Sequence, residues 1–475
     1  MHPCKHHEVC GLSDEAGLEE SLCILHSKDP EKDKQAFAAA LDAHCKKNSG
    51  DFTLVVFPEY ADFREAMFTD EVHFWGAEFT KGADFSCAKF TGGANFHDAI
   101  FTEVAYFFEA TFAKEANFGE ATFSGGANFS GVTFIEEVDF ECAKFTKEAI
   151  FSCAMFTKWA MLGGAMFTKR VDFGGATFAG LANFNETTFA ENASFSGARF
   201  SKKASFFGAR FSKGADFEGA IFTESANFTL SSFQGRTVFA ARRRGTRTAP
   251  IFWRAEVKFR ELIIDPPDAL RLIEADLRRC QFQDTDLRKV QMIAVTWPKI
   301  GSRLGVYDEI ATMEIGTERP WARIEQLYRE LKQNYEDRRD YERAGDFHYG
   351  EKEMRRRNPE TPTGARFLLT LYWLLSGYGE RYLRPLMWAG ILFAVCTFGY
   401  VVLGLIPKGA GSRLAITNVQ SWLHAAHYSF RVMTLLRPDD FVPVGYSKLV
   451  NTTQTILGPI FLSLFALALR QRLKR

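Results

Sequence analysis

Phenylalanine recurs between residues 52 and 239 at alternating steps of five and six, and 34 of the 35 positions that this rule defines are Phe. The exception is Leu162. The residue two places before each of them is small or β-branched, and it is usually Ala. The repeating unit is therefore Ala-(Asp/Asn)-Phe-x-x-Ala-x-Phe-x-x-x, eleven residues long. A period this regular is typical of repeat architectures, and it constrains the fold more than any other feature of the chain.

An eleven-residue period also occurs in right-handed coiled coils, but two features argue against a helix here. A five-residue step turns an α-helix by about 140° and would place successive Phe on different sides. The segment also contains 18 Gly, each of which costs about 1 kcal/mol relative to Ala inside a helix. In an extended chain, by contrast, Ala and the Phe two residues later lie on the same side. We therefore expect short strands with Ala and Phe inside and polar residues outside.

Each repeating unit supplies two short walls, so two consecutive units close a 22-residue coil with four walls. Phe then stacks on Phe from coil to coil, and burying each side chain contributes about 2 kcal/mol. No proline lies between Pro58 and Pro250, as expected where backbone N–H groups form continuous ladders. The segment resembles the pentapeptide repeat family, which implies an all-β solenoid, a right-handed quadrilateral β-helix, over residues 49–298. A plainer repeat predicts terminal coils at Leu277, Phe282, Leu287 and Met292.

The charge of the chain limits the partners of this solenoid. The formal net charge is zero, and residues 50–141 contain 17 acidic and 4 basic residues, against 7 and 11 in residues 142–240. Some pentapeptide repeat proteins imitate DNA and bind topoisomerases, which requires a strongly acidic face over much of the rod. Because only the first half is acidic, DNA mimicry is a minor alternative, and we expect no nucleic acid partner.

Residues 1–48 contain a group of possible metal ligands spaced C-x5-C-x12-C-x2-H: Cys4, Cys10, Cys23 and His26. Thiolate and imidazole ligands suit tetrahedral Zn²⁺, and a closed site with four ligands would be structural. His6 or His7 can replace one cysteine, and unrelated thiols in a tail are the alternative. Asp29 and Pro30 then predict the start of a helix that runs to about Lys47 and caps the solenoid.

Two segments without β character follow the solenoid. Residues 318–358 are charged, and apolar residues from Trp321 to Leu331 have helical spacing, which predicts two amphipathic helices. They form either a spacer hairpin or an element that transmits motion. Within residues 365–384, the apolar stretch extends only from Phe367 to Tyr378 and is too short to cross a membrane. We therefore expect a helix that lies along a membrane interface.

Residues 385–475 contain two long stretches without a charge, Leu386–Ile406 and Leu449–Leu469. Each is long enough to cross a hydrocarbon core of about 30 Å. Basic residues flank their far ends, which places both termini in the cytoplasm. We therefore predict a multi-pass protein of a bacterial inner (plasma) membrane, in contact with membrane lipid. A buried hairpin of apolar helices is the alternative.

The segment between the two stretches resembles the pore module of two-span potassium-type channels. Tyr428-Ser429-Phe430 and the run from Thr434 to Pro443 are similar to the pore helix and filter, and Gly458 occupies the position of a hinge glycine. This resemblance implies a homo-tetramer around a central pore.

The filter-like residues depart from that pattern. They are Thr434, Leu435, Leu436, Arg437, Pro438, Asp439 and Asp440. Arg437 and Asp439 replace the two filter glycines, and Pro438 restricts the backbone between them. A ladder of backbone carbonyls selective for K⁺ is therefore not expected. Rings of Arg437 and of the two aspartates can select ions by sign, or close the route by pairing with one another.

The sequence contains no glycine loop for phosphate and no nucleophile–base constellation, and we expect no enzymatic activity. The hypothesis that accounts for most features is an ion-channel-like oligomer with a cytoplasmic β-helical domain that senses or docks a ligand. The alternative is a non-conducting scaffold that is tethered to the membrane and binds a cytoplasmic protein through its solenoid.

Overall fold

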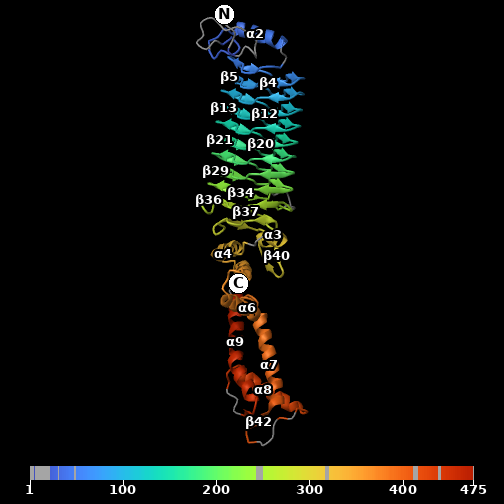
Figure 1. The fold of residues 1–475 in the computed structure, drawn as a ribbon, viewed down its shortest axis with the longest axis vertical. Coiled ribbons are helices and arrows are strands. Elements are labelled where there is room, and N and C mark those ends of the chain that lie inside the picture. Colours follow the sequence, from blue (N-terminus) through green and yellow to red (C-terminus); the bar gives the residue numbers. More distant parts are fainter. Residues whose placement is uncertain are drawn as a thin grey trace. The chain divides into compact units, whose positions relative to one another are not determined.

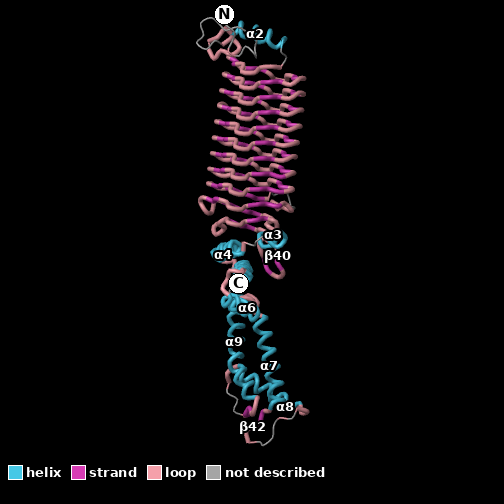
Figure 2. Tube along the Cα trace, in the orientation of Figure 1, coloured by secondary structure: helices cyan, strands magenta, loops and turns pink. Residues whose placement is uncertain are grey.

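The structure of the chain is a computed structural model. It describes residues 5, 22–29, 31–47, 50–241, 250–315, 320–409, 414, 416–436 and 440–473. The chain divides into two compact units. The first comprises Met1–Pro298 and Val306–Gly316, and the second comprises Lys299–Gly305 and Thr317–Arg475. Stacked short strands make up most of the first unit, and helices make up most of the second (Figures 1 and 2).

The first unit is a β-solenoid whose strands form four parallel sheets. Ten strands run from β1 (Val56–Phe57) to β36 (Ile263–Ile264), and eleven run from β2 (Ala61–Asp62) to β39 (Gln291–Ile293). Eight run from β3 (Met67–Phe68) to β31 (Ile221–Phe222), and ten run from β4 (Val72–His73) to β38 (Cys280–Gln281). The expected β-solenoid is confirmed, and the core positions of the plainer terminal repeat are buried at Leu277, Phe282, Leu287 and Met292.

In the regular part of the solenoid, each strand pairs with the equivalent strand of the next coil, whereas the last coils differ in length, as in the pair of Arg271 with Gln291. In the sheet that contains β11 (Thr111–Phe112) and β15 (Thr133–Phe134), for example, Thr111 pairs with Thr133 and Phe112 with Phe134. This register places identical positions of the repeat above one another. The 22-residue coil expected from the sequence is therefore the hydrogen-bonded unit of the solenoid.

The interior consists of stacked phenylalanine rings. Phe107 lies between Phe85 and Phe129, with ring centroids 4.9 and 4.7 Å away and interplanar angles of 8° and 1°. Neighbouring columns meet edge to face, as in the pair Phe96 and Phe107 at 5.5 Å and 89°. Both arrangements suit the charge distribution of aromatic rings. Phe107 and the preceding Ala105 are both 0% exposed, which confirms that Phe and Ala fill the interior.

The Asp or Asn between Ala and Phe has a specific local role. The side-chain Oδ1 of Asn117 accepts the backbone N–H of Gly119 at 2.8 Å, and Asn128 and Asp139 bind the N–H two residues later in the same way. Such Asx turns start the bend that leads to the next wall. The outward polar residue of the repeat therefore shapes each corner.

The amino-terminal end of the solenoid is capped by α2 (Lys34–Lys47). This helix begins later than the sequence predicted. Its start is set by Asp33, because the Asp33 carboxylate accepts the backbone N–H groups of Gln35 and Ala36. Asp29 instead accepts the N–H of Glu31 at 2.9 Å, and Pro30 lies outside the described residues.

The other end is covered by α3 (Tyr307–Ile315). The carboxylate of Asp308 accepts the backbone N–H groups of Phe282 and Gln283 at 3.1 and 3.0 Å. These N–H groups lie in one of the last coils, so the carboxylate satisfies donors at the end of a ladder. Burial raises the pKa of Asp308 to about 6, although the backbone donors favour its charged form.

The second unit begins with a short hairpin of β40 (Lys299–Ile300) and β41 (Arg303–Leu304). Its other elements are α4 (Trp321–Asp337), α5 (Tyr341–Arg357), α6 (Thr363–Ser376), α7 (Leu383–Leu403), β42 (Leu405–Pro407), α8 (Val419–Met433), β43 (Phe441–Pro443) and α9 (Ser447–Leu473). The two helices expected in residues 318–358 are therefore α4 and α5. The helix expected over residues 365–384 is shorter, because Gly377 adopts a left-handed conformation and ends α6.

Two of these helices, α7 and α9, are long and apolar enough to cross a membrane, with mean hydropathy 2.1 and 1.6. The first ends earlier than the predicted Ile406. Gly404 has φ +112° after the last helical residue, and β42 then pairs with β43 in an antiparallel hairpin.

Substitution of one stacked ring tests the contribution of the interior. We expect Phe107→Ala to lower the free energy of unfolding by about 3–5 kcal/mol, because it opens a cavity between two stacked rings. Phe108 is 40% exposed, so the neighbouring Phe108→Ala should cost less than about 1 kcal/mol. Urea denaturation of the full-length protein in detergent, followed by circular dichroism, measures both. Equal effects of the two substitutions would contradict the stacked interior.

Candidate functional site in the helical unit

The short helix α8 packs between the two long apolar helices. Ala425, Tyr428 and Val432 of α8 are buried in one cluster with Tyr400 and Val401 of α7. The rings of Tyr400 and Tyr428 meet edge to face at 4.9 Å and 80°. Met433, at the end of α8, packs with residues of α7 and α9 in a second cluster. The segment that the sequence assigned to a pore helix is therefore an α-helix held by both neighbours.

A buried network of polar side chains connects the same three helices. The Tyr400 hydroxyl of α7 donates to Gln454 Oε1 of α9 at 2.9 Å. Gln454 Nε2 donates to the carbonyl oxygen and Oγ of Ser429 in α8, at 3.1 and 2.6 Å. The Tyr428 hydroxyl donates to Asn451 Oδ1 at 3.1 Å. Because Tyr400, Ser429 and Gln454 are all fully buried, these hydrogen bonds fix the rotation of α8 about its own axis.

The filter-like residues begin directly after α8. Thr434 is the C-cap of this helix, and its hydroxyl donates to the Phe430 carbonyl at 2.9 Å. Leu435 has φ +60°, and both Leu435 and Leu436 are exposed. Arg437, Pro438 and Asp439 lie outside the described residues.

Asp440, the last filter-like residue, forms an ion pair with Arg431 in α8. The distance from Arg431 Nη1 to Asp440 Oδ2 is 3.1 Å. The sequence predicted that the aspartates could pair with Arg437, and Arg431 was not predicted as a partner. Arg431 lies in the last turn of α8, only nine residues before Asp440 in the sequence.

Gly458 lies where the end of α8 meets α9. A Cβ atom added to Gly458 would be 2.7 Å from Met433 Cγ and 2.9 Å from its Cα. Such distances leave no room for a side chain, so glycine allows the close approach of these two helices. The predicted hinge role stays a prediction, and Pro459 in the next position is inside α9.

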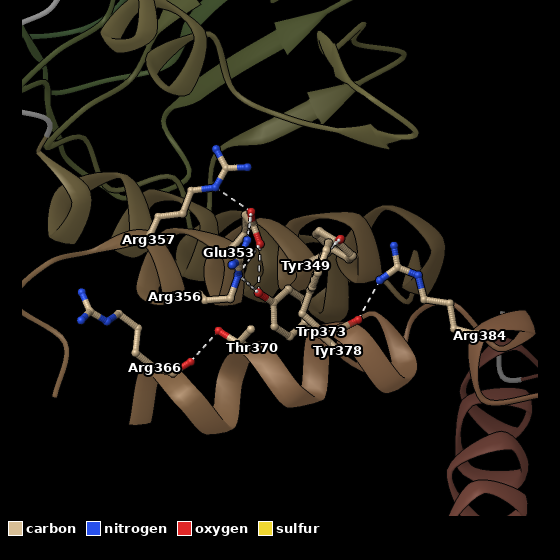
Figure 3. Close-up of polar contacts among 9 residues, drawn as sticks. All are labelled: Tyr349, Glu353, Arg356, Arg357, Arg366, Thr370, Trp373, Tyr378 and Arg384. Carbon is tan, nitrogen blue, oxygen red and sulfur yellow. Dashed lines mark hydrogen bonds and ion pairs between the residues drawn. The ribbon is translucent and has the colours of Figure 1, made fainter. Parts of the chain in front are cut away.

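A second polar cluster joins α5, α6 and the segment before α7 (Figure 3). The Glu353 carboxylate accepts from Arg356 Nη2 at 2.8 Å, from Arg357 Nε at 2.6 Å and from the Tyr378 hydroxyl at 2.9 Å. Burial opposes ionisation of Glu353, but the Arg356 hydrogen bond and the Arg357 charge hold its pKa below the usual range. This cluster was not predicted from the sequence. The spacing of Glu353 with Arg356 and Arg357 could have indicated the two local ion pairs, but not the contact with Tyr378.

Trp373 lies at the centre of this junction between α5, α6 and the start of α7. Its indole ring lies between the guanidinium groups of Arg356 and Arg384, with Cζ atoms 5.0 and 5.1 Å from the ring centroid. The indole N–H donates to the Tyr349 hydroxyl at 2.8 Å, and Arg384 donates to the Trp373 carbonyl at 2.7 Å. One aromatic side chain of α6 thus contacts both the charged helix α5 and the first residues of α7.

In the first unit, the structure brings together the last two of the four proposed metal ligands. Cys23 Sγ and His26 Nδ1 are 3.3 Å apart in a tight turn, and both residues are buried. His26 Nε2 lies 3.3 Å from the Thr53 carbonyl oxygen. Cys4 and Cys10 lie outside the described residues. Among the residues that the structure describes, no three His, Cys, Asp or Glu form a group that can hold a metal ion.

The sequence pattern of the family described as pentapeptide repeats (9 copies) matches residues 85–133, 107–155 and 162–210. The solenoid is therefore built from pentapeptide repeats. No curated protein and no solved structure matches the chain.

Removal of the central amide tests the buried network. We expect Gln454→Leu to destabilise the helical unit by about 1–3 kcal/mol, because the Tyr400 hydroxyl and the Ser429 groups lose a buried partner. Thr453 is exposed, so the adjacent Thr453→Val is the matched control. Thermal unfolding of the detergent-solubilised protein, monitored by the helical circular dichroism signal, measures the difference. An unchanged midpoint for Gln454→Leu would show that the network does not hold α8.

Proposed function

We propose that this chain is a membrane-anchored pentapeptide repeat protein that assembles into an ion-channel-like oligomer. The supporting observation is the position of α8, a short helix held between two apolar helices by a buried polar network. A simple membrane anchor needs only apolar contacts between its spans. A helix fixed in rotation, followed in the sequence by a run that contains charged residues, instead suits a re-entrant loop that presents this run to water.

One chain with two spans cannot enclose a pore, so the proposal requires several copies around one axis, and we propose a tetramer. The segment from Thr434 to Asp440 lines the entrance. Because the filter glycines are absent, the charges of Arg437, Asp439 and Asp440 decide which ions pass, rather than a carbonyl ladder. Both termini and the solenoid are cytoplasmic at an inner membrane. The solenoid, a right-handed quadrilateral β-helix, senses or docks a ligand.

A non-conducting scaffold is the second candidate, and two observations favour it. The pair of Arg431 and Asp440 within one chain neutralises a charge that the proposed ring would use. The solenoid also exposes large aromatic side chains on its surface, which can contact a protein partner: Trp75, Tyr106, Phe108 and Trp159.

Current across a planar bilayer distinguishes the two candidates. We expect the reconstituted full-length protein to pass current without preference for K⁺ over Na⁺. Arg437→Glu should shift the reversal potential toward cation selectivity, because it reverses the charge at the proposed entrance. Arg323→Glu, on the exposed surface of α4, is the matched control. No current under varied ions and voltages, together with a single copy per detergent particle, would exclude the channel in favour of the scaffold.

We also propose a structural zinc site formed by Cys4, Cys10, Cys23 and His26. In a tetrahedral site with Zn–S near 2.3 Å and Zn–N near 2.0 Å, a thiolate and an imidazole nitrogen lie roughly 3.5 Å apart. The observed 3.3 Å between Cys23 and His26 fits this geometry. The Thr53 carbonyl beside the other ring nitrogen is the kind of hydrogen-bond acceptor that orients a metal-bound histidine.

Metal analysis tests this site. The purified protein should contain about one Zn²⁺ per chain, as expected for a closed four-ligand site. The double variant Cys23→Ser, His26→Ala should lose it. Cys153 is exposed in the solenoid, and Cys153→Ser should retain full zinc content. Unchanged zinc in the double variant would remove the hypothesis.

A further inference from the structure

The helix α6 has two faces of opposite character. Residues three and four apart expose a continuous apolar face: Phe367 (69% exposed), Leu368 (64%), Leu371 (42%) and Leu374 (43%). On the opposite side, Trp373 is inserted between Arg356 and Arg384. A helix with this division suits the boundary between lipid headgroups and acyl chains.

The end of α6 packs against the apolar helices beside it. Leu375 packs against the buried cluster of Ala389 in α7, Met433 in α8 and Phe461 in α9. Large apolar side chains are also exposed at the start of α7, with Leu383 61% and Met387 53% exposed. Lipid that surrounds the two spans therefore also reaches α6.

Basic residues flank α6 on its polar side. Figure 3 shows Arg366 and Arg384 near the two ends of α6, on the side of the helix where α5 lies. Glu380 is the single acidic residue in the sequence between residues 361 and 436, whereas Arg366, Arg381 and Arg384 all lie close to α6 in the sequence. The excess of guanidinium groups complements the phosphates of anionic lipids.

A pocket of about 300 Å³ lies between the end of α6 and the last turns of α9. It is lined by Tyr372, Ser376, Gly379, Leu464, Leu467, Ala468 and Arg470. The residues of α9 provide an apolar wall, and Arg470 provides a guanidinium group beside it. On the α6 side, the Tyr372 side chain adds a hydroxyl group, whereas the Ser376 hydroxyl is already bonded to the Tyr372 carbonyl and the Gly379 N–H. An apolar wall next to a cation and a phenolic hydroxyl matches a phospholipid, with its acyl chain on the leucines and its phosphate at the arginine.

We propose that this pocket binds the phosphate and the upper part of one acyl chain of an anionic phospholipid. The bound lipid bridges α6 and α9, the two helices that line the pocket. This inference rests on the membrane insertion in the proposed function, but it does not depend on conduction.

Lipid titration of the full-length protein tests the inference. The delipidated protein in mild detergent is titrated with dioctanoyl phosphatidylglycerol or dioctanoyl phosphatidylcholine, and bound lipid is counted by native mass spectrometry. We expect at least a tenfold preference for phosphatidylglycerol, and inorganic phosphate should not displace this lipid at equal concentration. Arg470→Ala should remove the preference, and Leu467→Trp should weaken binding of both lipids by narrowing the pocket. Lys448→Ala, at the other end of α9, is the matched control and should bind like the unchanged protein.

Several results would overturn the inference. Equal affinity for both lipids, an unchanged preference in Arg470→Ala, or displacement by inorganic phosphate alone would each exclude this lipid site. If Leu467→Trp changed the number of subunits while lipid binding stayed the same, the surface would be an interface between copies of the chain. Recovery of the protein in the soluble fraction without detergent would refute the membrane insertion itself. Extraction by detergent without lipid preference would refute this inference alone.

Discussion

Stacking of identical rings at a 22-residue interval is the constraint on which the solenoid depends. Each Phe lies almost parallel to the Phe one coil away, as between Phe107 and Phe129 at an interplanar angle of 1°. This contact fixes the register of the backbone ladder, because a slip of one residue would turn every ring toward solvent. The ladder in turn satisfies the backbone of very short strands, which cannot be stable in isolation. Side-chain stacking and backbone pairing therefore stabilise one another in every coil.

The helical unit uses a different principle, with polar groups inside an apolar core. Tyr400, Ser429 and Gln454 cost free energy to bury unless every group is paired, and their mutual hydrogen bonds define one orientation of α8. At the junction of α5, α6 and α7, the ion pairs of Glu353 and the stacked Trp373 have a comparable role. Specific polar contacts thus position the helices that apolar packing alone would leave free to rotate or slide.

The sequence predicted the solenoid well because its period is local and repeats many times. Every Phe of the repeat follows the same spacing rule, so the buried interior, the 22-residue coil and the terminal coils at Leu277 to Met292 could be predicted from that spacing.

The boundaries of the helices were less predictable. Asp33 rather than Asp29 begins α2, and Gly404 ends α7 before the predicted Ile406. In both places several residues had the required character, and the local backbone geometry at one of them sets the boundary. The junction around Trp373 and the pair of Arg431 with Asp440 join residues whose proximity depends on how helices pack, which a single sequence does not encode in any simple pattern.

The fixed register has a geometric consequence for the surface of the solenoid. Each coil contacts only the coils before and after it, and successive coils are about 4.8 Å apart. The separation of two outward side chains along the rod is therefore set by the number of coils between them. Insertion or deletion of one 22-residue coil would change that separation by about 4.8 Å and leave the interior contacts of the remaining coils as they are. The length of the solenoid can therefore vary in steps of one coil without a change of fold, while the exposed residues of the repeat keep a fixed spacing along it.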